Sequence, residues 1–466
     1  MDAPDRQPSF AEQVPRVLSG WLDARTWREL KRTLALLALL PLTFILAIKL
    51  VHIVGDPILN AYGISVLLAT MVVMYLAFVH YHDPSEDAVP DDVPPLVTCL
   101  VAVHNEIGHI ERCLRSVVGS SYEPKEVIVI DDCSTDGTTE LLMGLAAELH
   151  VQLFTLKANV GKKHALVEGL RHAKGEIFVF TDSDCTLAPE AMERCVRALR
   201  AHPDIGAVSG HARALNAETN LLTRMQDVWY DGQFGVQKAA ESVFGSVTCV
   251  SGPLAVVRRA AVANYLPAWA NDRFAGAPFR FATDRQLTGY VLGQPWIGRK
   301  LKAAFADDPL VCDVDYPARR WRVEYVHSAA VLTIVPSTVR SLVRQQVRWK
   351  KSFIRNIFFT GTFIWRRGPG PALLYYFHLL FVIAAPFLAF RHLVILPLQG
   401  AAFLTFLYLC GVFLKGTVWS VAYKLQNPRS GRWIYRPLMS LTSTLALSWL
   451  LLYSALTLRK GVWSRG

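Results

Sequence analysis

Residues 176–184 read Glu-Ile-Phe-Val-Phe-Thr-Asp-Ser-Asp, a short run of β-branched and aromatic residues that ends in two carboxylates. Such a run predicts a buried strand over 176–180. Alternate side chains of an extended chain point the same way, so Asp182 and Asp184 share one side. Two hard oxygen ligands at a strand end suit Mg²⁺ or Mn²⁺ bridging a diphosphate. Asp-x-Asp is also a common turn composition, so its meaning depends on its surroundings.

Three similar runs precede this strand, at 96–103, 126–130 and 151–156. Helical patterns separate the runs and follow the last one, at 109–118, 136–149, 161–173 and 188–201. Alternating strands and helices with near-continuous apolar strands predict an α/β fold, in which helices cover both faces of a mostly parallel sheet. Ligands of such sheets bind in the loops that follow the carboxyl ends of the strands.

The loops after the first three strands are polar. Residues 104–106 (His-Asn-Glu) follow the first strand, and 131–137 (Asp-Asp-Cys-Ser-Thr-Asp-Gly) follow the second. We assign Asp132 to a contact with a nucleobase or ribose, and we interpret Asp136 as the N-cap of the next helix. After the third strand, 159–165 (Asn-Val-Gly-Lys-Lys-His-Ala) combines a glycine with two lysines at a helix start. That combination suits a phosphate, although a solvated Lys pair is the competing interpretation.

Two motifs lie farther along the chain. Asp284, in Thr-Asp-Arg, is a candidate general base for an acceptor hydroxyl, and an ordinary Asp–Arg surface pair is the alternative. Residues 345–349 read Gln-Gln-Val-Arg-Trp, in which the Trp offers a flat apolar face to a sugar ring and the Arg a fork for phosphate oxygens. An amphipathic helix at the membrane interface is the alternative, and both can hold at once.

The composition points to a membrane protein. Apolar residues make up 52% of the 466 residues and charged residues only 19%, and the apolar excess lies at the two ends. Lys plus Arg is 49 and Asp plus Glu 38, so the net charge of +11 suits nucleic acid, an anionic membrane or an anionic substrate. The eight cysteines show no zinc-site spacing and fit a reducing compartment. Disorder and a disulfide-rich secreted scaffold are excluded.

The N-terminal region predicts a membrane anchor. Residues 1–32 form an amphipathic pattern typical of an interfacial helix, with a solvated tail as the alternative. Two transmembrane helices are predicted within 33–82, from the apolar runs 33–54 and 64–79. Their connection, 55–63, has no Lys or Arg, so the positive-inside bias places the N-terminus and the chain after residue 82 in the cytoplasm.

The C-terminal region is apolar again. The runs 371–390 and 393–423 each predict one crossing, and Lys415 lies inside the second, where it could line an exit path. The run 438–458 has basic residues at both ends. One crossing cannot begin and end on the same face, so we expect a re-entrant or interfacial segment, or a second hidden pass.

The motif series resembles that of the membrane-integrated, processive family-two glycosyltransferases. The resemblance covers about 97–465, and 209–259 and 452–466 are most similar to bacterial hyaluronan synthases, whereas 334–349 also resembles chitin and chito-oligosaccharide synthases. The motifs that carry it are VAVHNE (101–106), VIVIDDCSTDGT (127–138), NVGKKHA (159–165), FTDSD (180–184), CVSGPL (249–254), ATDRQLT (282–288) and QQVRWKKS (345–352).

This resemblance implies a domain plan. A cytoplasmic GT-A domain at 96–345 is inserted between N- and C-terminal transmembrane helices. An interfacial helix with the QxxRW motif follows at 346–366, and the channel region comprises 371–466. The implied location is the plasma (inner) membrane.

The resemblance also implies roles for individual residues. On the donor side, Asn105 and Asp132 would hold uridine, Lys162 would approach the diphosphate, and Asp182 and Asp184 would bind the nucleotide and its Mn²⁺ or Mg²⁺. On the acceptor side, Asp284 would be the base. The remaining implied residues shape the acceptor cleft, hold the leaving group or fold back to the nucleotide, and they are Ser251, Gly252, Pro253, Gln345, Arg348, Trp349, Trp463 and Arg465.

The implied reaction is a single inverting displacement by a chain hydroxyl on a UDP-sugar, UDP-GlcNAc and with it UDP-GlcA. The expected partners are these donors, the nascent polysaccharide and the lipid bilayer, with no nucleic acid and a monomer as the working assembly. Three features depart from the family pattern: Thr283 replaces an acid, Ser464 replaces a Gly-Thr pair, and 294–320 is inserted, which we interpret as a solvated excursion.

Three other functions stay open. They are a chitin or chito-oligosaccharide synthase, a non-processive transferase with a lipid acceptor, and a membrane transporter with a regulatory domain. Transporters commonly have repeated halves, and this sequence shows no internal repeat.

Overall fold

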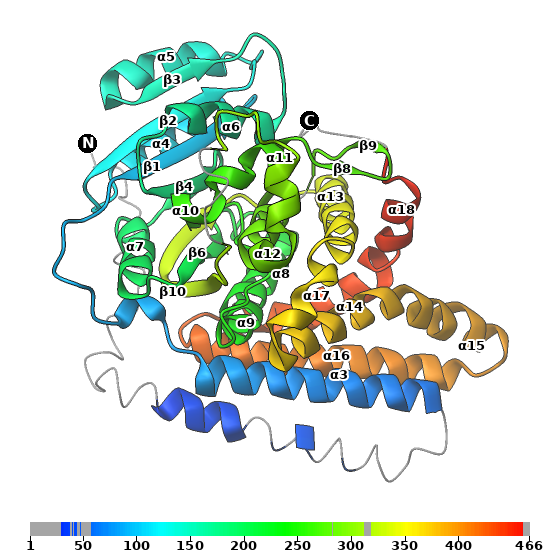
Figure 1. Ribbon diagram of the computed structural model, residues 1–466. Coiled ribbons are helices and arrows are strands. Elements are labelled where there is room, and N and C mark those ends of the chain that lie inside the picture. The colour runs from blue at the N-terminus through cyan, green and yellow to red at the C-terminus, as the bar shows by residue number, and fades with distance from the viewer. Residues whose placement is uncertain are drawn as a thin grey trace, which may run out of the picture.

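The centre of the protein is an eight-stranded sheet with the strand order β3-β2-β1-β4-β7-β6-β10-β5 (Figure 1). The computed structural model describes residues 57–281, 283–311 and 318–459, together with 29–37 and the single residues 40, 42, 43 and 47. The strands of the sheet are β1 Val97–Val103, β2 Lys125–Asp131, β3 Gln152–Thr155, β4 Ile177–Asp182, β5 Thr186–Leu187, β6 Ile205–Ala214, β7 Ala255–Arg258 and β10 Arg322–Thr333.

The directions of the strands decide which loops lie beside Asp182. β1 pairs in parallel with β2 and β4, β2 with β3, and β6 with β10, whereas β7 is antiparallel to β4 and β6. The predicted α/β fold with a mostly parallel sheet is therefore confirmed. Because β7 runs against β4, Ala255 pairs with Phe180. The chain just before Ala255 consequently lies at the carboxyl end of β4, beside Asp182.

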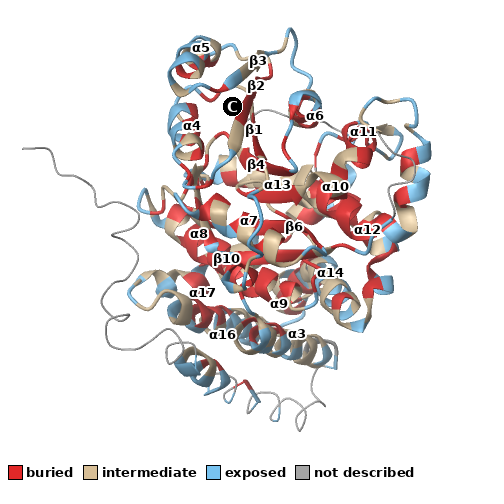
Figure 2. Cartoon of the chain, turned by 60° about the vertical axis from the view of Figure 1, so that its left-hand side comes forward, coloured by how far each residue is buried: buried red, intermediate tan, exposed pale blue. Residues whose placement is uncertain are grey.

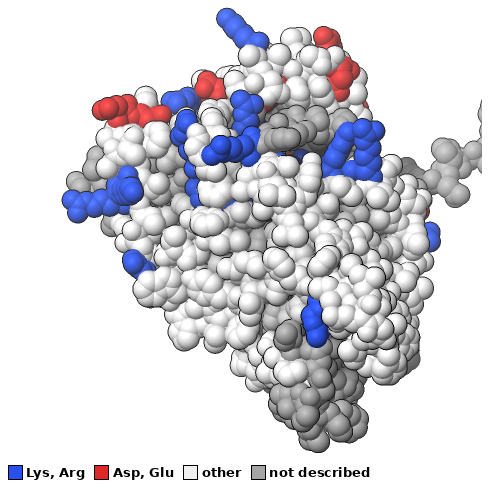
Figure 3. Space-filling model, turned by 90° about the vertical axis from the view of Figure 1, so that its right-hand side faces the viewer, with Lys and Arg blue, Asp and Glu red and all other residues white. Residues whose placement is uncertain are grey.

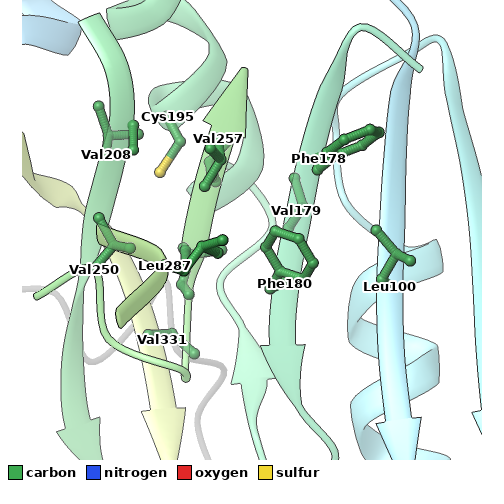
Figure 4. Packing of buried hydrophobic residues seen from close by; sticks show 14 of the residues in the cluster. Leu100, Phe178, Val179, Phe180, Cys195, Val208, Val250, Val257, Leu287 and Val331 are labelled. Carbon is green, nitrogen blue, oxygen red and sulfur yellow. The ribbon is translucent and has the colours of Figure 1, made fainter. Parts of the chain in front are cut away.

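Helices cover both faces of the sheet. Those predicted from the sequence are α4 Ile110–Val118, α5 Thr138–Leu149, α6 Lys162–His172 and α7 Ala191–Ala201, and those beyond them are α8 Leu221–Asp231, α9 Ala239–Ser242, α10 Arg259–Val262, α11 Leu266–Ala270, α12 Thr283–Ala303 and α13 Val339–Ile357. A small hairpin, β8 Arg273–Phe274 and β9 Ala277–Pro278, precedes α12. Leu100, Phe178 and Val257 point from neighbouring strands into the buried core (Figure 4).

The predicted solvated excursion at 294–320 is wrong over its first part. Residues up to Ala303 continue helix α12, and the side chain of Gln294 is buried. Its amide donates to the carbonyl of Ala261 (2.5 Å) and accepts from Trp321 Nε1 (3.0 Å), and Trp296 stacks on Phe363 with ring centroids 5.9 Å apart. Polar composition alone cannot tell a packed helix face from a solvated one. Residues 312–317 lie outside the described part.

Four described helices are long and apolar enough to cross a membrane. They are Asn60–Glu86, Pro369–Leu398, Ala402–Gln426 and Arg432–Leu456. The first of them includes most of α3 Pro57–Tyr75. The others contain α14 Pro369–Phe390, α15 Leu396–Leu398, α16 Ala402–Gln426, α17 Tyr435–Thr442 and α18 Leu450–Leu456. α3 and α16 run side by side beneath the α/β domain and expose much of their surface (Figures 1 and 2). Large exposed apolar side chains such as Phe387 and Phe403 give these helices the surface of a membrane protein.

The distribution of charge agrees with a membrane location. On the face shown in Figure 3, charged side chains gather on the upper part and are sparse over the lower part. Residues 29–37 are helical, whereas 1–28 and most of the predicted span 33–54 lie outside the described residues. The last run, expected to be re-entrant, interfacial or doubled, is one helical stretch, Arg432–Leu456, interrupted by a π-helical turn, Ser443–Leu447.

Buried contacts join the α/β domain to the C-terminal helices. Asp227 of α8 accepts hydrogen bonds from Arg213 of β6 (3.0 and 2.9 Å) and from Arg432 (2.7 Å), and Arg213 also donates to Asn427 (2.7 Å). At the other end, Ser454 of α18 contacts α13. Helix α13 begins at Val339, earlier than the predicted 346, because Thr338 caps it. The QVRW motif therefore lies inside one continuous helix.

Candidate active site

Asp182 and Asp184 form an acidic pair at the carboxyl end of β4. Ligand atoms of these two residues and of Cys185 all lie within 4.8 Å of one another. Burial raises the pKa of Cys185 well above its ordinary value, so the thiol stays protonated, and it donates to Asp184 Oδ1 (3.5 Å). The two carboxylates remain as the ligands for a hard divalent cation, and their oxygens suit Mg²⁺ or Mn²⁺.

The segment 249–253 (Cys-Val-Ser-Gly-Pro) connects this acidic pair to Asp284. The Thr181 hydroxyl donates to the carbonyl of Pro253 (2.8 Å), which fixes the segment to the end of β4. A β-carbon on Gly252 would stand 2.8 Å from Asp182 Oδ2, so only glycine leaves this carboxylate in place. At the other end, the Cys249 thiol donates to Asp284 Oδ2 (3.5 Å). Three residues of extended chain span at most about 10 Å, so the three acids share one region.

Asp284 lies in the first turn of α12, and two contacts hold that turn. Trp269 Nε1 donates to the carbonyl of Thr283 (2.9 Å), and the Val250 N–H donates to the Thr288 hydroxyl (2.8 Å). The Asp284 side chain is half-buried. Burial raises the pKa of Cys249 to about 11, so its thiol is a donor to the carboxylate at neutral pH. The Asp284 carboxylate therefore points toward the segment 249–253.

The donor-side loops are bound to one another. Both oxygens of Asp132 accept hydrogen bonds from the backbone of the next loop, from Val160 (2.7 Å) and Gly161 (2.9 Å). Burial raises the pKa of Asp132, which those two hydrogen bonds partly oppose. Asp132 thus orients the loop that begins α6, in addition to the nucleoside contact predicted for it. Gly161 has φ +88°, a conformation that favours glycine.

Asn105 performs a similar task between the first two loops. Its backbone has φ +54°, and its side-chain oxygen accepts from Thr135 N–H (2.8 Å). Its own N–H donates to the Ser134 hydroxyl (3.0 Å). The N-cap of α5 is Gly137, and Asp136, predicted as that cap, binds Thr138 instead (N–H 3.1 Å). The loops therefore form one preorganised edge of the sheet.

Lys162 reaches the acidic pair directly. Its ammonium forms an ion pair with Asp182, and both side chains are mostly buried. This contact brings the predicted phosphate-binding lysine and a predicted metal ligand together. A positive charge here also neutralises part of the acidic pair.

The QVRW helix meets the site through Tyr230 of α8. The ring of Trp349 lies 5.9 Å from the rings of both Tyr230 and Trp229. Tyr230 is also hydrogen-bonded to Gln345 and lies within electrostatic range of Asp184 and Arg348. Gln345 and Trp349 of this motif consequently contact one aromatic side chain that is also within electrostatic range of Arg348 and Asp184.

Sequence reasoning did not find Lys238. It ends a π-helical turn, Gly232–Lys238, and such turns are frequent at functional sites. The buried ammonium donates to the hydroxyls of Ser209 (2.7 Å) and Ser251 (2.6 Å) and lies 4.0 Å from the Phe234 ring centroid. Tyr230 was also missed. Neither position has a local signal, because only the fold brings these side chains to Ser251 and Trp349.

The remaining predicted residues are Trp463 and Arg465, which lie outside the described residues. Of the described candidates, the structure brings the acidic pair, Lys162, the segment 249–253, Asp284 and the QVRW helix to one end of the sheet. Asn105 and Asp132 lie in the loops of the same edge.

A comparison with known families decides the class of protein. Residues 98–266, which hold the donor loops, the acidic pair and the segment 249–253, match the family described as glycosyl transferase family 2. Residues 98–266 are a family 2 glycosyltransferase domain. This confirms the resemblance and the predicted enzyme class, and the transporter alternative is set aside.

Curated relatives of this glycosyltransferase include hyaluronan synthases and N-acetylglucosaminyltransferases. Hyaluronan synthase of Streptococcus pyogenes is 28% identical over 444 residues, which cover 93% of this chain and 97% of that protein. An N-acetylglucosaminyltransferase of Rhizobium meliloti (strain 1021) is 31% identical over 296 residues, 62% of this chain and 63% of that protein. Among solved structures, the mannosyltransferase PcManGT from Pyrobaculum calidifontis, in complex with GDP-Man and Mn²⁺, aligns at a TM-score of 0.47 and 21% identity, covering 85% of this chain and 99% of that one.

Proposed function

We propose that this family 2 glycosyltransferase is a processive polysaccharide synthase that uses UDP-GlcNAc, together with UDP-GlcA, and extrudes its product through the membrane helices. The observation that carries the proposal is the segment 249–253, which contacts Asp182 at one end and Asp284 at the other. In this proposal Asp182 binds the diphosphate, Asp284 is the base, and one short stretch of chain contacts both. The leaving group and the attacking hydroxyl would then meet along the segment 249–253.

The donor side of the proposal uses Asp182, Asp184 and Lys162. A divalent cation held by the two carboxylates would neutralise charge on the diphosphate of the donor. Lys162, released from its ion pair with Asp182, is close enough to meet the same phosphates. Arg348, near Tyr230, supplies a guanidinium for the departing UDP. The preorganised loops at Asn105 and Asp132 receive the nucleoside.

The acceptor side uses Asp284 as the base. Its carboxylate takes the proton of the chain hydroxyl as that oxygen attacks C1 of the donor sugar, and the C1–O bond to UDP breaks. Inversion follows from a single displacement. Trp349, half-buried beside Trp229 and Tyr230, offers the apolar ring face for the sugar that precedes the reacting one. Ser251, held by Lys238, lines the space between.

A group of basic side chains where the α/β domain meets the membrane helices supports the proposal that the product is acidic. His378 of α14 lies against α13, with its ring 5.9 Å from that of Phe353. It is within electrostatic range of three cations from three other helices, Arg285 of α12, Lys350 of α13 and Lys415 of α16. Positive charges that converge from three helices on this histidine suit a polyanion better than a neutral chain. We name these four residues the basic group.

The proposed location follows from the same arrangement. The QVRW helix contacts α18, and two members of the basic group, His378 and Lys415, lie in helices that are long enough to span a bilayer. Together with the charge bias of the sequence, this supports a plasma-membrane protein with a cytoplasmic catalytic domain.

The deciding experiment supplies donors to the purified full-length protein in detergent with Mn²⁺ or Mg²⁺. UDP-GlcNAc is given alone and then with UDP-GlcA, and the products are treated with hyaluronidase or chitinase. We expect a polymer that forms only with both donors and is cut by hyaluronidase. The Asp284→Asn protein serves as the negative control.

A second candidate, a chitin or chito-oligosaccharide synthase, is favoured by the similarity to N-acetylglucosaminyltransferases. It predicts polymer from UDP-GlcNAc alone that chitinase cuts. A labelled product that extracts into organic solvent would indicate a lipid acceptor. Absence of polymer with every donor pair would contradict processivity.

A further inference from the structure

A buried carboxylate, Asp272, lies between two buried cations at the side of the candidate site. Asp272 precedes β8, and its side chain is 4% exposed. Arg355 of α13 donates to it twice, from Nε to Oδ2 (3.1 Å) and from Nη2 to Oδ1 (2.7 Å). Lys163 Nζ lies 3.9 Å from Oδ2 on another side. A bidentate pair in a buried setting fixes orientation as well as distance.

The two cations belong to opposite halves of the site. Lys163 is the second residue of α6, next to Lys162, which pairs with Asp182 on the donor side. Arg355 follows Arg348 by about two turns of α13, so both occupy the same side of the helix that carries the acceptor motif. One carboxylate thus contacts the helix that begins at the donor and the helix that carries the acceptor residues.

The catalytic helix joins the same cluster. The Lys163 ammonium donates to the side-chain oxygen of Gln286 (2.5 Å) and to the carbonyl of Phe279 (3.2 Å). Gln286 lies two residues after Asp284 in α12 and is fully buried. Three helices, α6, α12 and α13, therefore meet at Lys163 and Asp272.

We propose that Lys163, Asp272 and Arg355 form a positioning triad that keeps α6 and α13 in register, so that donor binding and acceptor binding depend on each other. The role of this triad in catalysis rests on the proposed function. None of the three residues is assigned a contact with substrate, and each acts through a neighbour, Lys162 on the donor side and Arg348 on the acceptor side. Removing one partner leaves a buried charge unpaired. A substitution that keeps the charge but changes the shape of the side chain disturbs only the relative position of α6 and α13.

The test is a double-mutant cycle on UDP affinity, measured by calorimetry with Mn²⁺ on the full-length protein in detergent. Arg355→Lys keeps the charge but loses the fork, and Lys163→Met removes the second cation. We expect each single variant to raise the Kd for UDP about threefold to tenfold, and the double variant to be no worse than the weaker-binding single variant. Both act by breaking the same connection through Asp272, so their effects overlap.

A matched control separates positioning from a general loss of stability. Arg340→Lys makes the same exchange on the same helix at an exposed position, and it should leave the Kd unchanged. Thermal unfolding midpoints of all variants report folding, and the KM for the UDP-sugar should rise with the Kd. If Lys163→Met does not fold, the Arg355→Lys arm still decides, because it keeps every charge.

Two results would overturn the triad. One is a double variant in which the fold-increases in Kd of the two single variants multiply, because this would mean that Lys163 and Arg355 have independent structural roles. The other is an unchanged Kd in Arg355→Lys. A failure of the unsubstituted protein to bind UDP would be a separate result, because it would overturn the proposed function first and this inference with it.

Discussion

Gly252 packs directly against the carboxylate of Asp182, and a β-carbon there would stand 2.8 Å from Oδ2 and 3.1 Å from Oδ1. Gly252→Ala should therefore displace one ligand of the proposed cation. We expect the Mn²⁺ concentration for half-maximal activity to rise about tenfold, which corresponds to about 1.4 kcal/mol. A metal titration of the transfer rate measures it.

Gly144→Ala is the matched control for this substitution. Nothing lies within 4 Å of a β-carbon at Gly144, in helix α5. The exchange should stabilise the protein by about 0.5–1 kcal/mol and leave the metal dependence unchanged. If Gly252→Ala also leaves it unchanged, Asp182 does not bind the cation.

Asp284→Asn tests the base. A positioned general base contributes about 10²–10⁴-fold to a rate, so kcat should fall by that factor while the KM for the donor changes little. Asp307→Asn, at an exposed position, is the control and should retain full activity. Equal losses in the two variants, or a loss of donor binding in Asp284→Asn, would place the base elsewhere.

We expect the transfer rate to fall at alkaline pH because of Lys238. Burial lowers the pKa of Lys238 from 10.5 to about 8. The negative charges of Asp284 and Glu241 oppose this shift, and the positive charge of Arg285 adds to it. The ammonium that holds Ser251 is present below pH 8 and lost above it, so the transfer rate should fall as the pH rises through about 8. Lys238→Met should be slower at pH 7 and lack this fall.

Titration of Lys238 should affect the stability of the protein in the opposite direction to the transfer rate. Between pH 8 and 10.5 the unfolded chain binds the Lys238 proton and the folded protein does not, so the free energy of unfolding rises with pH in that window. A melting series at these pH values, compared with Lys238→Met, separates the two effects. A rate that stays level up to pH 9 would contradict a role for this ammonium.

Lys415 tests the basic group. Lys415→Gln removes one of the charges near His378 without changing the catalytic site. We expect slower elongation and shorter chains with UDP-GlcNAc and UDP-GlcA together, and unchanged hydrolysis of a single donor. Gel filtration of labelled product measures chain length. Unaltered chain length would mean that the polymer does not pass this side chain.

Local patterns were sufficient for the first half of the α/β domain. Strands β1 to β4 and helices α4 to α7 follow from apolar periodicity, because each element and its period are contiguous in sequence. The acidic pair at Asp182 and Asp184 was found for the same reason. Periodicity failed at 294–303, where buried Gln294 and Gly298 make a packed helix look polar.

The other functional contacts are long-range. Lys238 meets Ser251 because a π-helical turn rotates its side chain, and Tyr230 meets Trp349 because α8 and α13 pack together. The triad joins residues that lie far apart along the chain. Tyr230 and Trp349, and the members of the triad, lie too far apart for one window of sequence to contain them. Lys238 and Ser251 are nearer in sequence but belong to different segments, so local periodicity does not indicate that they meet.

The sequence by itself determined the βα order, the apolar ends and the chemical groups available at each strand end, because these depend on residue type and spacing. The tertiary structure alone decided which of those groups meet. The antiparallel β7 carries Gly252 to Asp182 and Cys249 toward Asp284, and strand direction is set by how the whole sheet closes, not by the residues of one strand.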